Sequence, residues 1–130
     1  MKYKQILFLL LIIIIFCFLS CDKKNPTEPV KITDINGNWS GNTSQGYNFT
    51  FTVSNNKITK WHIKVKSGGM TQDINTYSCS VSINNNKFTL SHGYWPQPEL
   101  DINGEFKSNT KCNGSFDFSG TTGTWSTSKN

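Results

Sequence analysis

The sequence contains no arginine, and its 13 basic residues are all lysines. Two of them lie within the first twenty residues, so the rest of the chain carries 11 lysines against 8 acidic residues, a formal balance of +3. A balance this weak, spread along the chain, excludes the dense basic footprint of a nucleic-acid-binding protein. We therefore expect no nucleic-acid partner.

The sequence also lacks the usual residues of catalytic and metal sites. It has two histidines, His62 and His92, and it contains neither a nucleophile motif nor a catalytic pair of carboxylates. Strand alternation would place His62 on an outer face and His92 at an inner strand end, so we do not expect them to converge. Together with the thiols of Cys79 and Cys112 they offer too few ligands for a metal. We expect neither an enzyme nor a bound metal or cofactor.

The chain has one long apolar run, and it lies at the N-terminus. Residues Ile6 to Leu19 carry no charge and follow the two basic residues Lys2 and Lys4. The run is shorter than the roughly 20 residues that a helix needs to cross a bilayer. This pattern predicts a secretory signal peptide, with an uncleaved signal anchor as the alternative.

The end of this run, Phe18-Leu19-Ser20-Cys21, resembles the bacterial lipobox. The resemblance implies that residues 1–20 are removed as a lipoprotein signal peptide and that acyl chains such as palmitate are attached at Cys21. Residues 21–36 would form a lipidated tether, because the segment is polar and its prolines do not continue a helix. We expect a protein of the bacterial cell envelope, anchored to a membrane by lipid and facing the periplasm or the exterior. The sequence leaves the choice of membrane open.

The four cysteines divide into two groups. Cys17 belongs to the predicted signal and Cys21 to the predicted lipid anchor. Cys79 and Cys112 remain as an even pair in an exported domain, where a disulfide is expected. Such a bond would stabilise a domain of this size by roughly 3 to 4 kcal/mol.

From Gly37 onward, apolar and polar residues alternate, and clusters of Gly, Asn and Ser interrupt the alternation at short intervals. This pattern predicts an antiparallel all-β domain over residues 37–130. The expected architecture is an eight-strand up-and-down meander, either closed as a small barrel or flattened into a β-sandwich. The predicted strands are 37–43, 47–54, 57–66, 75–84, 87–93, 99–107, 111–118 and 124–128.

Opposed residues of a hairpin share one face, and this rule predicts the strand registers. The predicted turns are Ser44–Gly46, Asn55-Asn56, Asn85-Asn86, Ser108–Thr110 and Gly120–Gly123. They oppose Trp39 with Phe51, Val53 with Ile58, Val81 with Leu90, Ile102 with Phe116, and Phe118 with Trp125. The third strand needs a β-bulge near Thr59-Lys60 if Trp61 is to face inward.

The predicted inward residues are mostly aromatic and should fill most of the interior. They are Trp39, Phe49, Phe51, Trp61, Ile63, Tyr77, Val81, Leu90, Ile102, Phe106, Phe116, Phe118 and Trp125. Cys79 and Cys112 fall on the inner side as well. Gly104 and Gly114 face each other across a hairpin and would leave interior room, which keeps a lipocalin-like carrier of a small apolar ligand as an alternative function.

Several short motifs carry a resemblance to known proteins. Gly37-Asn38-Trp39-Ser40-Gly41, Ser44-Gln45-Gly46, Phe49-x-Phe51-x-Val53 and Gly123-Thr124-Trp125 are similar to those of small secreted bacterial β-domains. The predicted strand order also resembles that of lipocalin-like lipoproteins. The likeness spans residues 37–128 but consists of turn and core positions, so it implies a fold and no particular activity.

One predicted loop, residues 91–99, combines aromatic, histidine and proline residues and is the candidate binding site. Tyr94 and Trp95 would stack on a sugar ring or on an apolar residue of a partner, while His92, Gln97 and Glu99 would supply hydrogen bonds. The alternative is that Tyr94 and Trp95 close the end of the barrel as ordinary core residues.

Four lysines gather on the predicted third strand: Lys57, Lys60, Lys64 and Lys66. Three of them share one face, a pattern that favours a solvated sheet surface over a contact for anionic lipid or glycan. The sequence as a whole predicts a monomeric, membrane-anchored exported lipoprotein. Its expected role is non-catalytic binding of a glycan or an envelope protein, or an envelope-structural role.

Overall fold

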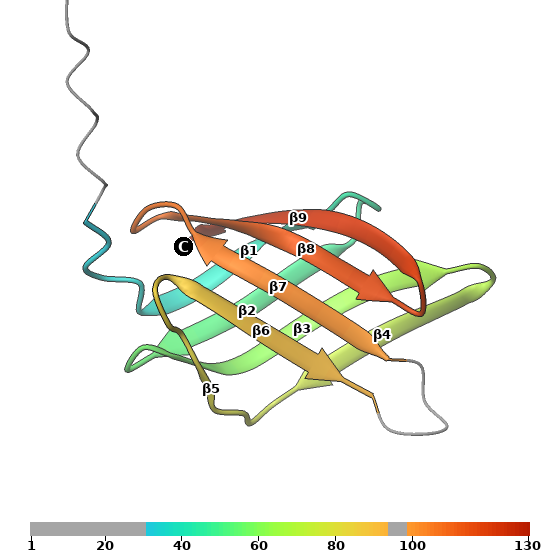
Figure 1. Ribbon diagram of the computed structural model, residues 1–130, viewed down its shortest axis with the longest axis horizontal. Helices are drawn as coiled ribbons and strands as arrows, with labels where there is room; N and C mark the ends of the chain where they lie inside the picture. The colour runs from blue at the N-terminus through green and yellow to red at the C-terminus, as the bar shows by residue number, and fades with distance from the viewer. Residues whose placement is uncertain (1–30, 94–98) are drawn as a thin grey trace, which may run out of the picture.

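The computed structural model describes residues 31–93 and 99–130, and within them it contains nine β-strands and no helix (Figure 1). The strands are β1 (Gly37–Thr43), β2 (Asn48–Ser54), β3 (Lys57–Ser67), β4 (Met70–Thr76), β5 (Val81–Ser82), β6 (Lys87–His92), β7 (Leu100–Phe106), β8 (Lys111–Phe118) and β9 (Thr121–Lys129). The all-β prediction is confirmed.

The nine strands form one antiparallel sheet with the order β4-β3-β2-β1-β9-β8-β7-β6, and the short β5 pairs with β3. Successive hairpins build each half, and the first and last strands, β1 and β9, join the halves. The sheet curls so that β6–β9 cross over β1–β4 (Figure 1). The predicted up-and-down meander is therefore confirmed as a curled, barrel-like sheet whose two end strands are β4 and β6.

Asparagine and glycine turns set most of the registers as predicted. Asn55 and Asn56 have φ of 50° and 59°, and Asn85 and Asn86 have φ of 50° and 63°. Asparagine tolerates this left-handed region, which two-residue hairpin turns require. The predicted pairs of Trp39 with Phe51, Val53 with Ile58 and Ile102 with Phe116 are all present.

The predicted β-bulge lies in β3. Val53 pairs with Ile58 and Thr52 pairs with Lys60, so Thr59 is the extra residue on β3. A single extra residue exchanges the two faces of the strand beyond it. The apolar residues that it turns inward are Trp61, Ile63 and Val65, all buried.

The predicted fourth strand, 75–84, is wrong in its bounds. Residues Met70–Thr76 form β4, which pairs with β3 through a tight turn at Gly68, where φ is 56°. Because Ile74 is the inward residue of β4, Tyr77 has the outward parity and is 74% exposed, in contrast to the predicted inward position. Val81 pairs with Ile58 of β3, not with Leu90.

The turn between β8 and β9 is also tighter than predicted. It consists of Ser119 and Gly120, with φ of 50° and 80°. The side chain of Asp117 accepts a hydrogen bond from the Gly120 N–H at 2.9 Å, which holds the turn at this position. Phe118 therefore pairs with Thr121, and Trp125 pairs with Gly114 instead of Phe118.

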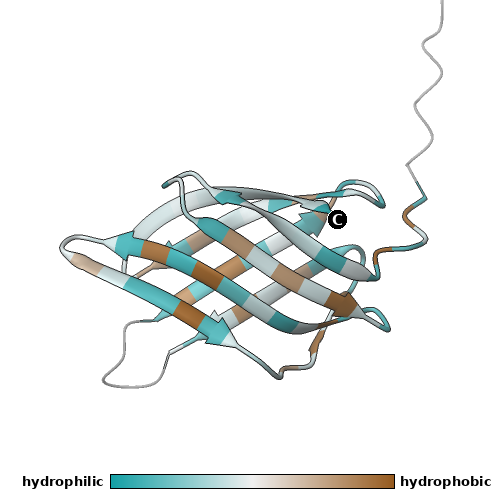
Figure 2. Ribbon diagram, turned by 180° about the vertical axis from the view of Figure 1, so that it is seen from behind, coloured by the Kyte–Doolittle hydropathy of each residue, from teal (hydrophilic) through white to brown (hydrophobic). Residues whose placement is uncertain are grey.

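Apolar and polar residues alternate along the strands, as the coloured bands in Figure 2 show, and the apolar side chains form the buried core. The largest fully buried side chains include Trp39, Phe49 and Phe106. The Trp39 and Phe106 rings meet edge to face with centroids 4.9 Å apart, and Phe49 meets Trp125 in the same way at 4.8 Å. Each such pair adds about 0.5–1.5 kcal/mol to the stabilisation from burial alone.

Aromatic rings occupy the room expected beside Gly104 and Gly114. A methyl group at Gly104 would lie 2.3 Å from Cζ of Phe88, and one at Gly114 would lie 2.6 Å from Cζ2 of Trp125. Both distances are far below van der Waals contact. The two glycines therefore admit the Phe88 and Trp125 rings and do not leave a cavity for a ligand.

The predicted disulfide is absent, and Cys79 and Cys112 are free thiols. Cys79 lies against β3, where its Sγ donates a hydrogen bond to the Ile58 carbonyl at 3.3 Å. Cys112 lies in β8 and pairs with Phe106 and Thr127, whereas Cys79 lies between β4 and β5, so the two thiols belong to segments that do not pair with each other. Burial raises the pKa of the Cys112 thiol to about 12 and raises the pKa of Cys79 as well.

The packing at Gly104 predicts a large effect of one added methyl group. We expect Gly104→Ala to lower the free energy of unfolding by about 1–3 kcal/mol, because the Phe88 ring has to shift. Gly69→Ala is the control, since a methyl group there has no heavy atom within 4 Å. The measurement is denaturant unfolding of both variants, and an equal loss in the two would contradict the packing described here.

The burial of Cys112 predicts low reactivity towards iodoacetamide. The thiolate is the reacting form, and a folded-state pKa near 12 keeps the thiol protonated well above its ordinary value of 9.0. The contribution of the protonated Cys112 thiol to the free energy of unfolding is fully present below pH 9.0, and it is lost as the pH rises toward 12. Peptide mass spectrometry should find Cys112 unlabelled in the native protein at mildly alkaline pH and labelled after unfolding. Recovery of a Cys79–Cys112 disulfide peptide would contradict the free thiols.

Candidate functional site

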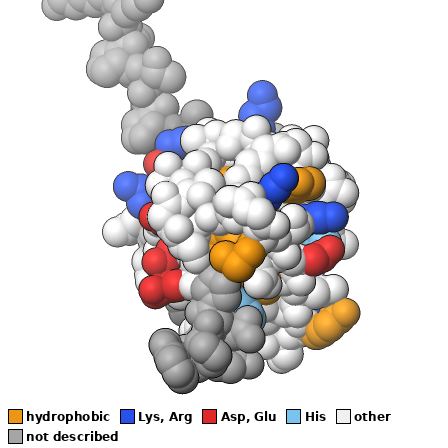
Figure 3. Space-filling view, turned by 90° about the vertical axis from the view of Figure 1, so that its right-hand side faces the viewer, with side chains coloured by type: hydrophobic (Ala, Val, Ile, Leu, Met, Phe, Trp, Pro, Cys, Tyr) orange, Lys and Arg blue, Asp and Glu red, His pale blue; other side chains and the backbone are white. Residues whose placement is uncertain are grey.

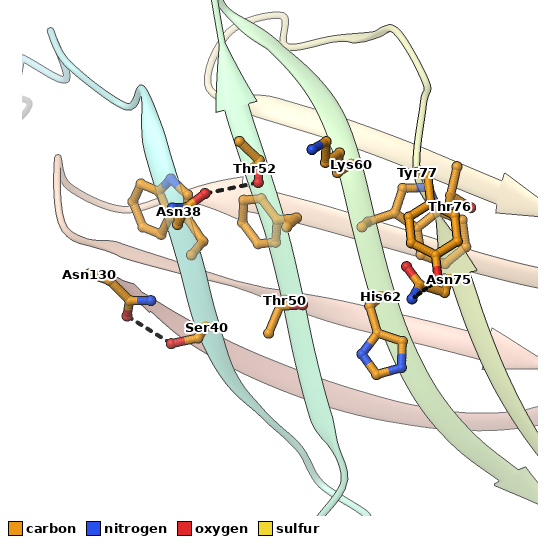
Figure 4. Close-up of a pocket in the computed structure, with 13 residues that line it drawn as sticks. Asn38, Ser40, Thr50, Thr52, Lys60, His62, Asn75, Thr76, Tyr77 and Asn130 are labelled. Atoms are coloured by element: carbon orange, nitrogen blue, oxygen red, sulfur yellow. Dashed lines mark hydrogen bonds between the residues drawn. The ribbon is translucent and has the colours of Figure 1, made fainter.

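A hollow of about 550 Å³ lies on the outer face of the sheet over β1–β4 (Figure 4). Most of its lining residues are neutral and polar. These neutral polar residues are Asn38, Ser40, Thr50, Thr52, Asn75, Thr76 and Asn130. The lining also includes Lys60, His62, Tyr77, Trp39, Phe51 and Trp61. These residues come from β1–β4, from Tyr77 just after β4, and from Asn130.

The strand register brings the polar residues together. Asn38 pairs with Thr52 across β1 and β2, and Thr50 pairs with His62 across β2 and β3. Opposed residues point to the same side of a sheet, and the alternate residues of these strands enter the core. The hollow therefore lies on the opposite face of β1–β4 from the aromatic core.

Hydrogen bonds fix two amide side chains at the hollow. The Thr52 hydroxyl donates to Oδ1 of Asn38 at 2.9 Å, and the Ser40 hydroxyl donates to Oδ1 of Asn130 at 2.8 Å (Figure 4). In both bonds the amide oxygen is the acceptor, so neither bond uses an amide N–H donor. Held side chains lose less rotamer entropy when they bind a ligand.

The β4 side of the hollow carries an exposed aromatic ring. Tyr77 follows β4, and its hydroxyl oxygen accepts a hydrogen bond from Nδ2 of Asn75 at 3.0 Å. The neighbouring His62 has its Nε2 2.6 Å from Oδ1 of Asp73. The ring of Tyr77 is thus tied to the strand while its face remains open to solvent.

This arrangement is suited to a ligand rich in hydroxyl groups. Asn and Thr side chains offer both donors and acceptors, and an exposed Tyr ring offers an apolar face to the C–H groups of a sugar. A ligand that lies across β1–β4 would meet these groups at the spacing of neighbouring strands, which is about 4.8 Å.

A second hollow, of about 270 Å³, lies over β6–β8 and has a different lining. Its charged side chains are Lys87 and Glu105, and no aromatic side chain lines it. We call this the reference hollow, because it lacks the aromatic ring that the β1–β4 hollow has.

Only part of the predicted binding loop lies within the described residues. His92 ends β6 and turns its ring toward the core, where it meets Trp61 edge to face at 5.9 Å. Glu99 is exposed, and its carbonyl accepts a hydrogen bond from the Ser119 N–H at 3.1 Å. Tyr94, Trp95 and Gln97 lie outside the described residues. Neither His92 nor Glu99 lines the β1–β4 hollow.

The two histidines lie where strand parity predicts. His62 is on the outer face beside Asp73, whereas the ring of His92 packs edge to face with that of the buried Trp61. Within residues 31–93 and 99–130, no group of three His, Cys, Asp or Glu side chains is placed to hold a metal ion.

Little in the sequence indicates the β1–β4 hollow. Its lining residues are ordinary Asn, Ser and Thr of separate strands, and they meet only through strand pairing. The one available signal was the outward parity of Thr50 and Thr52 opposite the outward His62. The sequence prediction misses Tyr77 because the predicted strand 75–84 gives it the parity of Val81, whereas it follows β4, in which Ile74 is the inward residue.

No protein-family model, curated protein or solved structure matches this chain. The resemblances to the lipobox and to lipocalin-like lipoproteins therefore stay predictions, and Cys21 lies outside the described residues. The described part of the chain has no helix of the length and apolar character needed to cross a membrane.

Proposed function

We propose that the chain is an exported lipoprotein whose all-β domain binds a glycan of the cell envelope and does not alter it chemically. The observation that carries the proposal is the β1–β4 hollow, in which hydrogen bonds hold amide and hydroxyl groups at the β1 side and the exposed ring of Tyr77 lies at the β4 side. Polar groups of this kind, fixed on rigid strands, provide orientation and specificity for a ligand.

The balance between hydrogen bonds and aromatic surface favours a sugar over an apolar ligand. Thr50, Thr52 and Asn75 would lose their contact with water on binding, and this desolvation is offset only when the ligand returns hydrogen bonds. Sugar hydroxyls both donate and accept hydrogen bonds, so they replace the hydrogen bonds to water that these residues lose. The aromatic residues beside Gly104 and Gly114 fill the interior, so the carrier alternative gains no support from the packing.

The proposed anchor rests on the N-terminal pattern and on where the fold begins. The lipid would be attached at Cys21, and β1 begins at Gly37. The chain is joined to the domain slightly earlier, because Ile35 is buried and its carbonyl accepts a hydrogen bond from Nε1 of Trp39 at 3.0 Å. The free tether would therefore end before Ile35.

Lipid attachment predicts incorporation of palmitate that depends on one cysteine. Expression in a bacterial host with labelled palmitate should label the protein, and Cys21→Ser should abolish the label. Cys79→Ser is the control and should keep it, because that thiol lies within the folded domain. Equal labelling of the Cys21→Ser protein would contradict the proposed anchor.

Glycan binding through the β1–β4 hollow predicts a dependence on its aromatic ring. Tyr77→Ala should weaken binding on a glycan array by roughly three- to tenfold, because the stacking surface is lost. The full chain in detergent is used throughout. Asn113→Ala is the control, since Asn113 lines the reference hollow over β6–β8.

The array also tests whether a glycan is the ligand at all. We expect a restricted set of glycans to bind, with the same set weakened by Tyr77→Ala. Binding of no glycan, or binding that Asn113→Ala weakens more than Tyr77→Ala, would rule out the β1–β4 hollow as the glycan site.

A further inference from the structure

The positive charge of the described chain is concentrated on one strand. Residues 37–76, which form β1–β4, contain four lysines and one acidic residue, and all four lysines belong to β3. Residues 77–93 and 99–130 contain four lysines and four acidic residues and are balanced. In Figure 3, which shows one face of the molecule, most of the acidic side chains gather at the left beside some lysines, and at the right lysines lie beside a histidine and an acidic side chain.

The bulge at Thr59 arranges the basic residues of β3 into a row. Beyond the bulge, Trp61, Ile63 and Val65 face the core. The residues that alternate with them face outward: Lys60, His62, Lys64 and Lys66. We call these four residues the basic row, and it runs along the outer face of β3 beside the hollow.

The basic row is poorly neutralised by the protein itself. Asp73 is the one acidic residue of β1–β4, and its carboxylate contacts His62. Among the described residues, no carboxylate forms an ion pair with a lysine of the row. In contrast, Lys107 pairs with Glu105, and Lys129 pairs with Asp34 at 3.2 Å.

Two residues of the segment between β1 and β2, Gln45 and Tyr47, contact members of the row. The amide side chain of Gln45 bonds the backbone of Lys66 twice, with distances of 2.7 Å and 2.8 Å. The ammonium group of Lys64 lies 5.4 Å from the centre of the Tyr47 ring. The lysines of the row, which form no ion pairs within the described part of the chain, should attract an anion, and this attraction should weaken as the salt concentration rises.

The neighbours of the row narrow the class of anion. Thr52 lies opposite Lys60, and Thr50 lies opposite His62, so each of these two basic side chains has a hydroxyl group beside it on the same face. An anionic lipid surface needs only the cations, whereas a ligand that carries both carboxylates and hydroxyl groups matches the cations and the hydroxyls together. Uronic acid polymers have this chemistry.

We propose that the ligand of the β1–β4 hollow is an acidic polysaccharide, whose carboxylates lie along the basic row and whose hydroxyl groups meet Thr50, Thr52 and Asn38. This inference rests on the proposed function and adds the charge of the glycan. Lys60 lines the hollow and belongs to the row, so one continuous ligand reaches both.

The test measures binding of the full chain, held in neutral phosphatidylcholine vesicles, to polygalacturonate, to dextran and to vesicles with added phosphatidylglycerol. We expect polygalacturonate to bind and the affinity to fall as salt is raised. The triple variant Lys60→Gln/Lys64→Gln/Lys66→Gln should bind about tenfold more weakly, the sum of three exposed charge contacts.

The control variant, Lys87→Gln/Lys107→Gln/Lys111→Gln, removes the same charge from the β6–β8 side and should change the affinity less than about twofold. Equal losses in the two triple variants would overturn the assignment to the basic row. Dextran binding that needs Tyr77 but not the lysines would overturn the acidic ligand and leave the glycan-binding function intact. Lysine-dependent binding to phosphatidylglycerol vesicles without binding to polygalacturonate would replace the polysaccharide with a lipid surface.

Discussion

The β-bulge at Thr59 is the constraint on which both faces of β3 depend. With Val53 opposite Ile58 and Thr52 opposite Lys60, one extra residue exchanges the faces of the strand beyond it. The indole of Trp61 then enters the core, and the basic row points to solvent. Without the extra residue, Lys60 would take the inward position and Trp61 the outward one. The hydrophobic core and the proposed binding face are thus two consequences of a single irregularity.

The packing on the inner face leaves the outer face for the binding that we propose. Rings of Phe88 and Trp125 occupy the space beside Gly104 and Gly114, where a carrier would need a cavity. The outer face carries the polar groups, and the rigid strands beneath hold them. This site could not be read from the sequence, because its residues come from separate strands and only the pairing register assembles them. The loop at 91–99 was easier to select because its unusual composition is contiguous.

Much of the sheet could be predicted because its turns carry their own signals. The Asn-Asn turns permit positive φ, and the parity of Trp61 demanded the bulge. Prediction failed where two turns competed: the segment 117–123 has Gly120 and Gly123, and the hydrogen bond from Gly120 to Asp117 selects the tighter turn. It failed again at Cys79 and Cys112, because an even number of thiols gives no information on whether the fold brings them together.

The most direct test of this account is the register of β2 against β3 in solution. Nuclear Overhauser effects between backbone protons across the two strands report which residues lie opposite each other. The account predicts cross-strand contacts of Phe51 with Trp61 and of Thr50 with His62, and none that place Phe51 opposite Lys60. A regular ladder with Phe51 opposite Lys60 would contradict the bulge, and with it both the core and the basic row.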